Sequence, residues 1–167
     1  SDVWYYNTDL FDGTNGAGIV IRTTVAIKYT ECITSDALRS SLGRRGSGLK
    51  SGEDIDMAFS ACDLGLGTGK FAALSLVHLI PQQRLSDDYL FRLIEGIAYS
   101  EAIVLAMRGD PPSKISRVDR LVELYKNLRM DALQRRTARA RALGKTRAVN
   151  AWRAAQQSVV QRQVNPN

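Results

Sequence analysis

The stretch Ser86–Leu143 decides the fold, and it reads SDDYLFRLIEGIAYSEAIVLAMRGDPPSKISRVDRLVELYKNLRMDALQRRTARARAL. Its first half repeats large apolar residues at the spacing of an amphipathic helix, and Ser86 is placed to cap that helix. Gly109 is suited to end the helix, and Pro111-Pro112 prevents its continuation. A second apolar stripe begins near Ser116. Because the connection is short, the two helices are predicted to pack as an antiparallel pair.

The second helix is expected to continue to Leu143 and to break at Gly144. A last helix is predicted over residues 148–160, and the tail 161–167 is expected to be disordered in the free chain. The buried stripe of the second helix is predicted to comprise Val118, Leu121, Val122, Tyr125, Leu128, Ala132 and Leu133.

The first 33 residues predict a β-hairpin arm. Residues 3–6 are aromatic and β-prone, and residues 12–18 are rich in types that tolerate a turn. Residues 18–33 then alternate apolar and polar side chains, which predicts a strand. An isolated hairpin is only marginally stable in water, so its apolar face must be covered by the helices or by a neighbouring copy. The sequence is compatible with either arrangement.

The segment between the arm and the helix pair predicts three shorter helices. Residues 34–36 offer N-cap side chains for a helix that extends to Leu42. Residues 51–54 have the form of a capping box and predict a second helix, with acidic residues in its first turn. Residues 70–80 form an apolar run that predicts a third helix, stopped by Pro81.

No residue pattern supports catalysis or cofactor binding. The run Gly65–Phe71 suggests a phosphate-binding loop, but its glycine spacing is one residue short and Phe71 replaces the required hydroxyl. His78 lies in an apolar run and is expected to be a half-buried structural residue. Cys32 and Cys62 are expected to be buried thiols. We therefore expect no enzyme, no cofactor and no metal site.

These features predict a mainly α protein. It is a helical bundle with a long antiparallel helix pair, an N-terminal β-hairpin arm and a basic C-terminal helical extension. At 167 residues the chain is expected to be a single domain, 1–167, divided into the arm (1–33), a helical body (34–143) and the extension (144–167). No apolar run approaches the roughly 20 residues that span a bilayer, and the start lacks a secretory signal, so no membrane partner is expected.

Charge is distributed unevenly along the chain. Residues 1–107 hold 9 Lys/Arg and 13 Asp/Glu, a net charge of −4, whereas residues 108–167 hold 14 and 4, a net charge of +10. Residues 132–167 carry eight basic side chains and no acidic one. This placement favours an acidic partner, either nucleic acid or the surface of another protein, over a merely solvated helix. The candidate contact residues are Arg135, Arg136, Arg139, Arg141, Lys145, Arg147 and Arg153.

The helical segment resembles the head-to-tail adaptor (connector) proteins of tailed bacteriophages. The resemblance covers residues 34–143, and its clearest part is Tyr89–Ala102 preceded by Ile80-Pro81 and followed by Leu124-Tyr125 and Ala132. The hairpin expected here precedes the helices, whereas in that family it lies between them.

The resemblance implies a non-catalytic virion protein, assembled in the host cytoplasm. Such adaptors form a ring, commonly of twelve copies, below the portal protein and around a DNA channel, and they also contact tail proteins. Their C-terminal segments dock on the portal. The alternative is a sequence-nonspecific nucleic-acid-binding protein of a packaging or nucleoid type, in which the same arginines contact the phosphates of double-stranded DNA.

Overall fold

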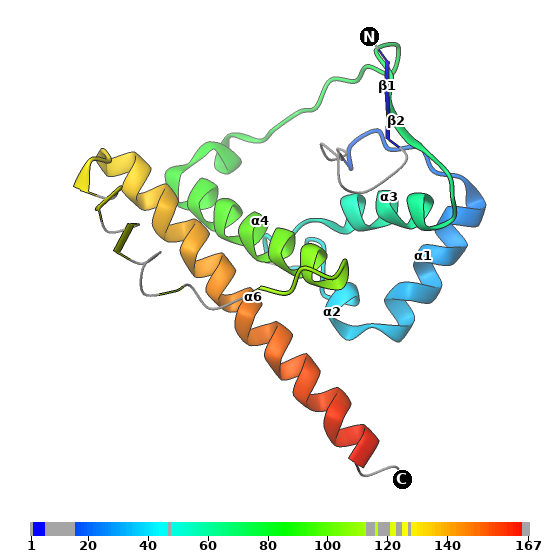
Figure 1. The fold of residues 1–167 in the computed structure, drawn as a ribbon. Coiled ribbons are helices and arrows are strands. Elements are labelled where there is room, and N and C mark those ends of the chain that lie inside the picture. The colour runs from blue at the N-terminus through cyan, green and yellow to red at the C-terminus, as the bar shows by residue number, and fades with distance from the viewer. Residues whose placement is uncertain are drawn as a thin grey trace. The chain divides into compact units, whose positions relative to one another are not determined.

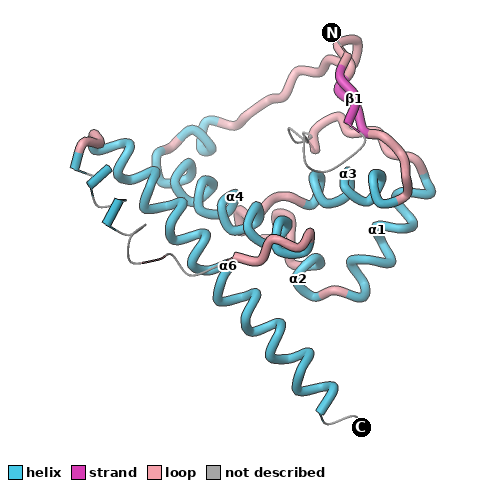
Figure 2. Tube along the Cα trace, viewed as in Figure 1, coloured by secondary structure: helices cyan, strands magenta, loops and turns pink. Residues whose placement is uncertain are grey.

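The structure, a computed structural model, describes residues 2–5, 16–46, 48–112, 116, 121–122, 125–126 and 128–164. The chain forms two compact units. Unit 1 comprises residues 1–43 and 52–81, and unit 2 comprises residues 44–51 and 82–167. Helices make up most of unit 2 and are the main regular elements of unit 1, which also holds one small sheet (Figure 2). The predicted mainly α class is confirmed.

Unit 1 contains the helices α1 (Thr23–Ser35), α2 (Ala37–Ser40) and α3 (Glu53–Asp63), drawn in Figure 1. Asp36 caps α2 as predicted, because its Oδ1 accepts hydrogen bonds from the backbone of Leu38 at 2.8 Å and Arg39 at 3.1 Å. The helix α3 starts where the capping box predicted one, but its N-cap is Gly52, with φ +94°. The core of this unit consists of Val25, Leu42, Ala58, Phe59 and Ala61.

The strand predicted over residues 18–33 is wrong, and with it the β-hairpin arm. Residues 23–35 form α1 instead. Positions 25, 29 and 33 fit the four-residue spacing of a helix as well as the two-residue spacing of a strand. Val25 is buried while Ile27 is 56% exposed, as expected for a helix face. The hydroxyls of Thr30 and Thr34 donate to carbonyls four residues earlier, so these β-prone residues are satisfied within the helix.

The strand predicted at the N-terminus is present, but its partner is distant in sequence. The strand β1 (Val3–Tyr5) pairs antiparallel with β2 (Thr68–Lys70), and Trp4 lies opposite Gly69. The Trp4 and Phe71 rings make an edge-to-face contact with centroids 4.8 Å apart. Lys70 is thus a strand residue, and no helix begins behind it as a phosphate-binding loop requires.

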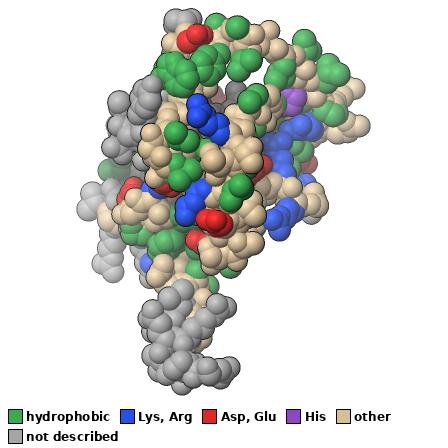
Figure 3. All heavy atoms as spheres, turned by 90° about the vertical axis from the view of Figure 1, so that its right-hand side faces the viewer, with side chains coloured by type: hydrophobic (Ala, Val, Ile, Leu, Met, Phe, Trp, Pro, Cys, Tyr) green, Lys and Arg blue, Asp and Glu red, His purple; other side chains and the backbone are tan. Residues whose placement is uncertain are grey.

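The helix predicted over residues 70–80 is also wrong. After β2 the chain runs to Pro81 without a regular element. Figure 3 shows hydrophobic side chains on the surface beside the single histidine. His78, expected to be half-buried, is exposed. The large apolar residues of this segment that are exposed are Leu74, Leu76, Val77, Leu79 and Ile80.

Unit 2 begins its helical part with a 3-10 turn, η1 (Gln82–Leu85), and continues with α4 (Asp87–Met107). Both predicted ends of α4 are confirmed. The Ser86 Oγ accepts from the backbone N–H of Tyr89 at 3.4 Å. At the other end, Gly109 adopts φ +98° and donates to Ala106, while Asp110 donates to Leu105. This pair of hydrogen bonds is a Schellman motif.

The second long helix is α6 (Ala132–Val164), and it differs from the predicted one. Within the predicted span, the described residues 121–122, 125–126 and 128 are helical, but residues 129–131 interrupt the helix before α6 begins. α6 passes through Gly144 without a break and includes the helix expected over 148–160. Residues 161–164, expected to be disordered, belong to it, and 165–167 lie outside the described residues. The predicted buried stripe is wrong wherever the structure describes it. Leu121, Val122, Tyr125, Leu128, Ala132 and Leu133 are exposed, and Val118 lies outside the described residues.

The long helix pair is confirmed, but its predicted antiparallel direction is wrong. Arg136, near the start of α6, lies 3.4 Å from Asp87 at the start of α4. Eleven residues later, Arg147 donates a hydrogen bond to Glu95. The residue numbers increase together along both helices, so α4 and α6 run parallel (Figure 1). Residues 108–131 separate them, whereas only about 10 extended residues are needed to return along the roughly 31 Å of α4.

A glycine makes this close contact possible. A Cβ on Gly144 would overlap the Glu95 carbonyl oxygen and would lie 3.0 Å from both the Ala98 Cβ and the Tyr99 nitrogen. Ala148, one turn further along α6, is fully buried. Because the distance between packed helices depends on the side chains at the crossing, only glycine permits this approach.

We predict that Gly144→Ala destabilises the protein by about 1–3 kcal/mol, because the added methyl group forces the two helices apart. At an ordinary helical position the same change stabilises by about 1 kcal/mol, so the sign of the effect is informative. Thermal unfolding followed by circular dichroism measures it. Asn150→Ala, at an exposed position of the same helix, serves as the control and should be neutral or stabilising. A Gly144→Ala protein as stable as the control would contradict the close contact.

Candidate functional site

A pocket of about 500 Å³ lies in unit 2, where the loop 48–50 meets α4 and α6. Its lining combines three cations, one carboxylate, one aromatic ring and three small or apolar residues. These are Lys50, Arg92, Arg147, Glu95, Tyr99, Gly48, Leu49 and Gly96.

The shape of the pocket follows from backbone packing on one turn of α4. A Cβ on Gly96 would overlap the Leu49 carbonyl group and would lie 3.1 Å from the Lys50 nitrogen, so the loop lies directly against the helix. The Ser51 N–H donates to the Oγ of the buried Ser100 at 3.0 Å and fixes the end of the loop. The pocket walls are therefore held by main-chain contacts.

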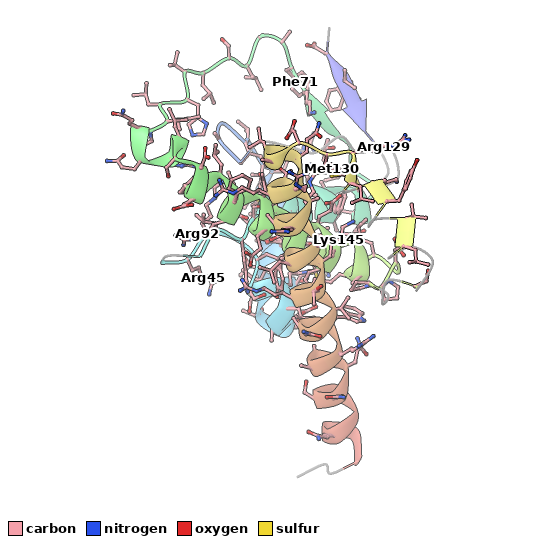
Figure 4. All side chains as sticks on the ribbon, turned by 90° about the vertical axis from the view of Figure 1, so that its left-hand side faces the viewer. Arg45, Phe71, Arg92, Arg129, Met130 and Lys145 are labelled. Atoms are coloured by element: carbon pink, nitrogen blue, oxygen red, sulfur yellow. The ribbon has the colours of Figure 1, made fainter. Side chains whose placement is uncertain are left out.

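The pocket carries a net positive charge. Lys50 Nζ lies 4.5 Å from the centroid of the Tyr99 ring, a cation–π contact that places the ammonium group at the pocket wall. Inside the pocket, Arg147 donates a hydrogen bond to Glu95. Arg45, exposed on the same loop, lies on the same side of the unit as Arg92 (Figure 4). An arrangement of this kind attracts anions.

All seven predicted contact residues lie on α6 and all are exposed, but they do not form one stripe. At about 100° per residue, Arg135, Arg139 and Arg153 lie opposite the face that packs on α4. Arg136 and Arg147 lie on one flank and contact acidic residues of α4. Arg141 and Lys145 lie on the other flank. The structure thus divides the set into three outward cations, two that contact acidic residues of α4 and two on the opposite flank.

Sequence reasoning identified only Arg147 among the pocket residues. The loop before Lys50, residues 43–48, is rich in glycine and arginine, a composition typical of an exposed turn. One signal does point to the pocket, namely Gly96 inside an otherwise strong helix. A glycine there costs about 1 kcal/mol relative to alanine, and such a cost commonly marks the close approach of another backbone.

A second group of charges is buried in unit 1. The Asp56 side chain is fully buried, and Arg39 Nε lies 3.1 Å from its Oδ2. Burial raises the pKa of Tyr29 from 10.0 to about 12, and the negative charges of Asp56 and Glu53 act in the same direction. Because the carboxylate is fully buried against the arginine, we interpret the group as a structural ion pair.

The cysteines, possible metal sites and possible membrane-spanning helices were also considered as functional features. Cys32 and Cys62 are thiols, half-buried where full burial was expected. Within the described part of the chain, no group of three or more His, Cys, Asp or Glu side chains could hold a metal ion. None of the described helices combines the length and apolar character needed to cross a membrane. No protein-family model matches the sequence, and comparison with curated proteins and with solved structures gives no match.

We predict that the free energy of unfolding decreases as the pH rises from about 10 to about 12. In that window unfolding releases Tyr29 to its ordinary pKa, so the unfolded state loses a proton that the folded state retains. Tyr29→Phe should lack this component. Urea unfolding of the wild-type and Tyr29→Phe proteins at pH 9 and pH 11.5 gives the change in unfolding free energy of each, and the difference between the two changes is the contribution of Tyr29. Equal pH dependence in the two proteins would show that the tyrosine is not held in its neutral form.

Proposed function

We propose that this chain is a non-catalytic structural subunit of a larger assembly, in the manner of the phage head-to-tail adaptors that its sequence resembles. In this proposal neighbouring copies form a ring below a portal protein within a virion, and tail proteins contact the ring. The basic α6 helix contacts an acidic surface of the portal or the DNA in the channel.

The observation that carries the proposal is the exposed apolar segment that follows β2. Within residues 74–80, Val77 is 86% exposed and Leu79 is 82% exposed. Each such side chain gains about 1.5–3 kcal/mol when fully buried. Contiguous apolar surface of this kind marks an interaction site. A second copy of the chain is the occupant that a ring supplies.

The length of α6 supports the same proposal. Its 33 residues extend about 50 Å, compared with about 31 Å for α4. Figure 1 shows its C-terminal part continuing past the end of α4. Gln156, Gln157 and Ser158 are exposed there. A projecting helix without acidic residues is suited to reach an acidic partner.

We predict that the purified protein forms a discrete symmetric oligomer and that Val77→Glu dissociates it or prevents its assembly. The substitution places a charge in the apolar segment, and because Val77 is exposed in the single chain, the fold should be retained. Light scattering coupled to gel filtration, with electron microscopy of the peak, measures the outcome. Gln82→Glu adds the same charge at an exposed polar position and should leave the oligomer intact. A chain that stays monomeric alone and never joins a portal ring would refute the proposal.

The second candidate is a sequence-nonspecific nucleic-acid-binding protein, favoured by the outward arginines of α6. Each phosphate contact contributes about 0.9 to the slope of log affinity against log salt concentration. Arg139→Gln should therefore lower the slope by about 0.9. Arg136→Gln should lower it less, because Arg136 already contacts Asp87 and Asp88 and packs on the Phe91 ring.

Fluorescence anisotropy with duplex DNA between 50 and 200 mM salt measures these slopes. Neutralising Arg135, Arg136, Arg139 and Arg141 together should abolish binding. Steep salt dependence in a monomer or dimer would favour this function over the adaptor. Equal effects of the Arg139 and Arg136 substitutions would show that α6 does not contact DNA through its outward face.

A further inference from the structure

We propose that the pocket in unit 2 binds a phosphate group, presented either by a small phosphorylated molecule or by a nucleic-acid backbone. The proposal rests on the geometry within this unit and does not depend on the adaptor function.

Cations reach the pocket from three separate segments of the chain. Lys50 comes from the loop, Arg92 from α4 and Arg147 from α6. Guanidinium groups match the oxygens of phosphate in paired hydrogen bonds, and an ammonium group adds a compact charge. A phosphate group offers several acceptor oxygens to donors from all three segments, whereas a single exposed arginine offers only one guanidinium.

The contact between Arg147 and Glu95 supports an oxyanion site. The Arg147 guanidinium already donates to the carboxylate of Glu95, which is 17% exposed. Glu95 therefore acts as an internal competitor for an incoming anion. Three cations against one carboxylate leave the lining with a net charge of +2. The site thus favours an anion, and a divalent cation would be repelled.

The pocket also has a suitable size and is preorganised. Its volume of about 500 Å³ falls within the range of ligand sites and exceeds that of one phosphate, so a sugar or a second phosphate can enter with it. The Gly96 contact and the hydrogen bond from Ser51 to Ser100 fix the loop before a ligand binds. Binding consequently orders little additional backbone, which reduces its entropic cost.

Isothermal titration calorimetry on the full chain tests the proposal with inorganic phosphate, ATP and a short oligothymidylate. Citrate serves as a carboxylate of comparable charge. Arg92→Ala and Lys50→Ala should each weaken the affinity for the phosphate compounds by about tenfold or more, because each removes a charged contact. Glu95→Gln should strengthen the affinity about threefold or more, because it removes the competing carboxylate. Arg22→Ala, an exposed cation of unit 1, should have no effect.

The outcomes separate the two sources of phosphate. Binding of inorganic phosphate or ATP that depends on Arg92 identifies a small-molecule site, and binding of the oligonucleotide alone identifies a backbone site. Failure of all three to bind would overturn the proposal. So would affinities that Arg92→Ala and Lys50→Ala leave unchanged, or citrate binding as tight as that of ATP. Circular dichroism of each variant confirms its fold, and Glu95→Gln, whose effect is a gain, cannot be explained by unfolding.

Discussion

The absence of a side chain at Gly144 determines the architecture of unit 2. At that point α6 lies against the main chain of α4, on the turn formed by residues 95–99. The loop before Ser51 lies against the same turn through Gly96. One helical turn is therefore covered by two other segments through backbone contacts. The pocket lies where both segments approach this turn.

Ion pairs between α4 and α6 add to the contact at Gly144. The acidic residues of α4 that α6 contacts are Asp87, Asp88 and Glu95, and they pair with Arg136 and Arg147 on one flank of α6. Exposed pairs of this kind contribute little stability individually, typically 0–1 kcal/mol. The order of these pairs along the two helices is more informative, because it fixes the register of two parallel helices. These acids of α4 lie against one flank of α6, away from Arg135, Arg139 and Arg153 on its outward face.

Helix caps and helix ends could be predicted well from the sequence, whereas the pairing of distant segments could not. The Ser86 cap, the Gly109 stop, the Asp36 cap and the start of α3 depend on a few adjacent residues, and all are confirmed. The direction of the helix pair and the partner of β1 depend on contacts between distant segments. Periodicity contains no information on either.

The errors have physical causes of the same kind. The apolar positions of α1 satisfy both a two-residue and a four-residue period, and only the burial of Val25 decides between them. Gly144 suggested a helix end, because glycine is intrinsically unfavourable within a helix. Tertiary packing overrides that preference here. The pocket was not predicted because its residues are spread from Lys50 to Arg147 and share no motif.

The uninterrupted course of α6 has a mechanical consequence. From the Gly144 contact the helix extends unequally, about 18 Å back to Ala132 and about 30 Å on to Val164. A tilt of about 10° therefore displaces the far end by about 5 Å while the crossing point stays in place. The pocket lies beside this contact, and Arg147 is carried on the longer arm. The far end of α6 and one wall of the pocket therefore belong to the same uninterrupted helix.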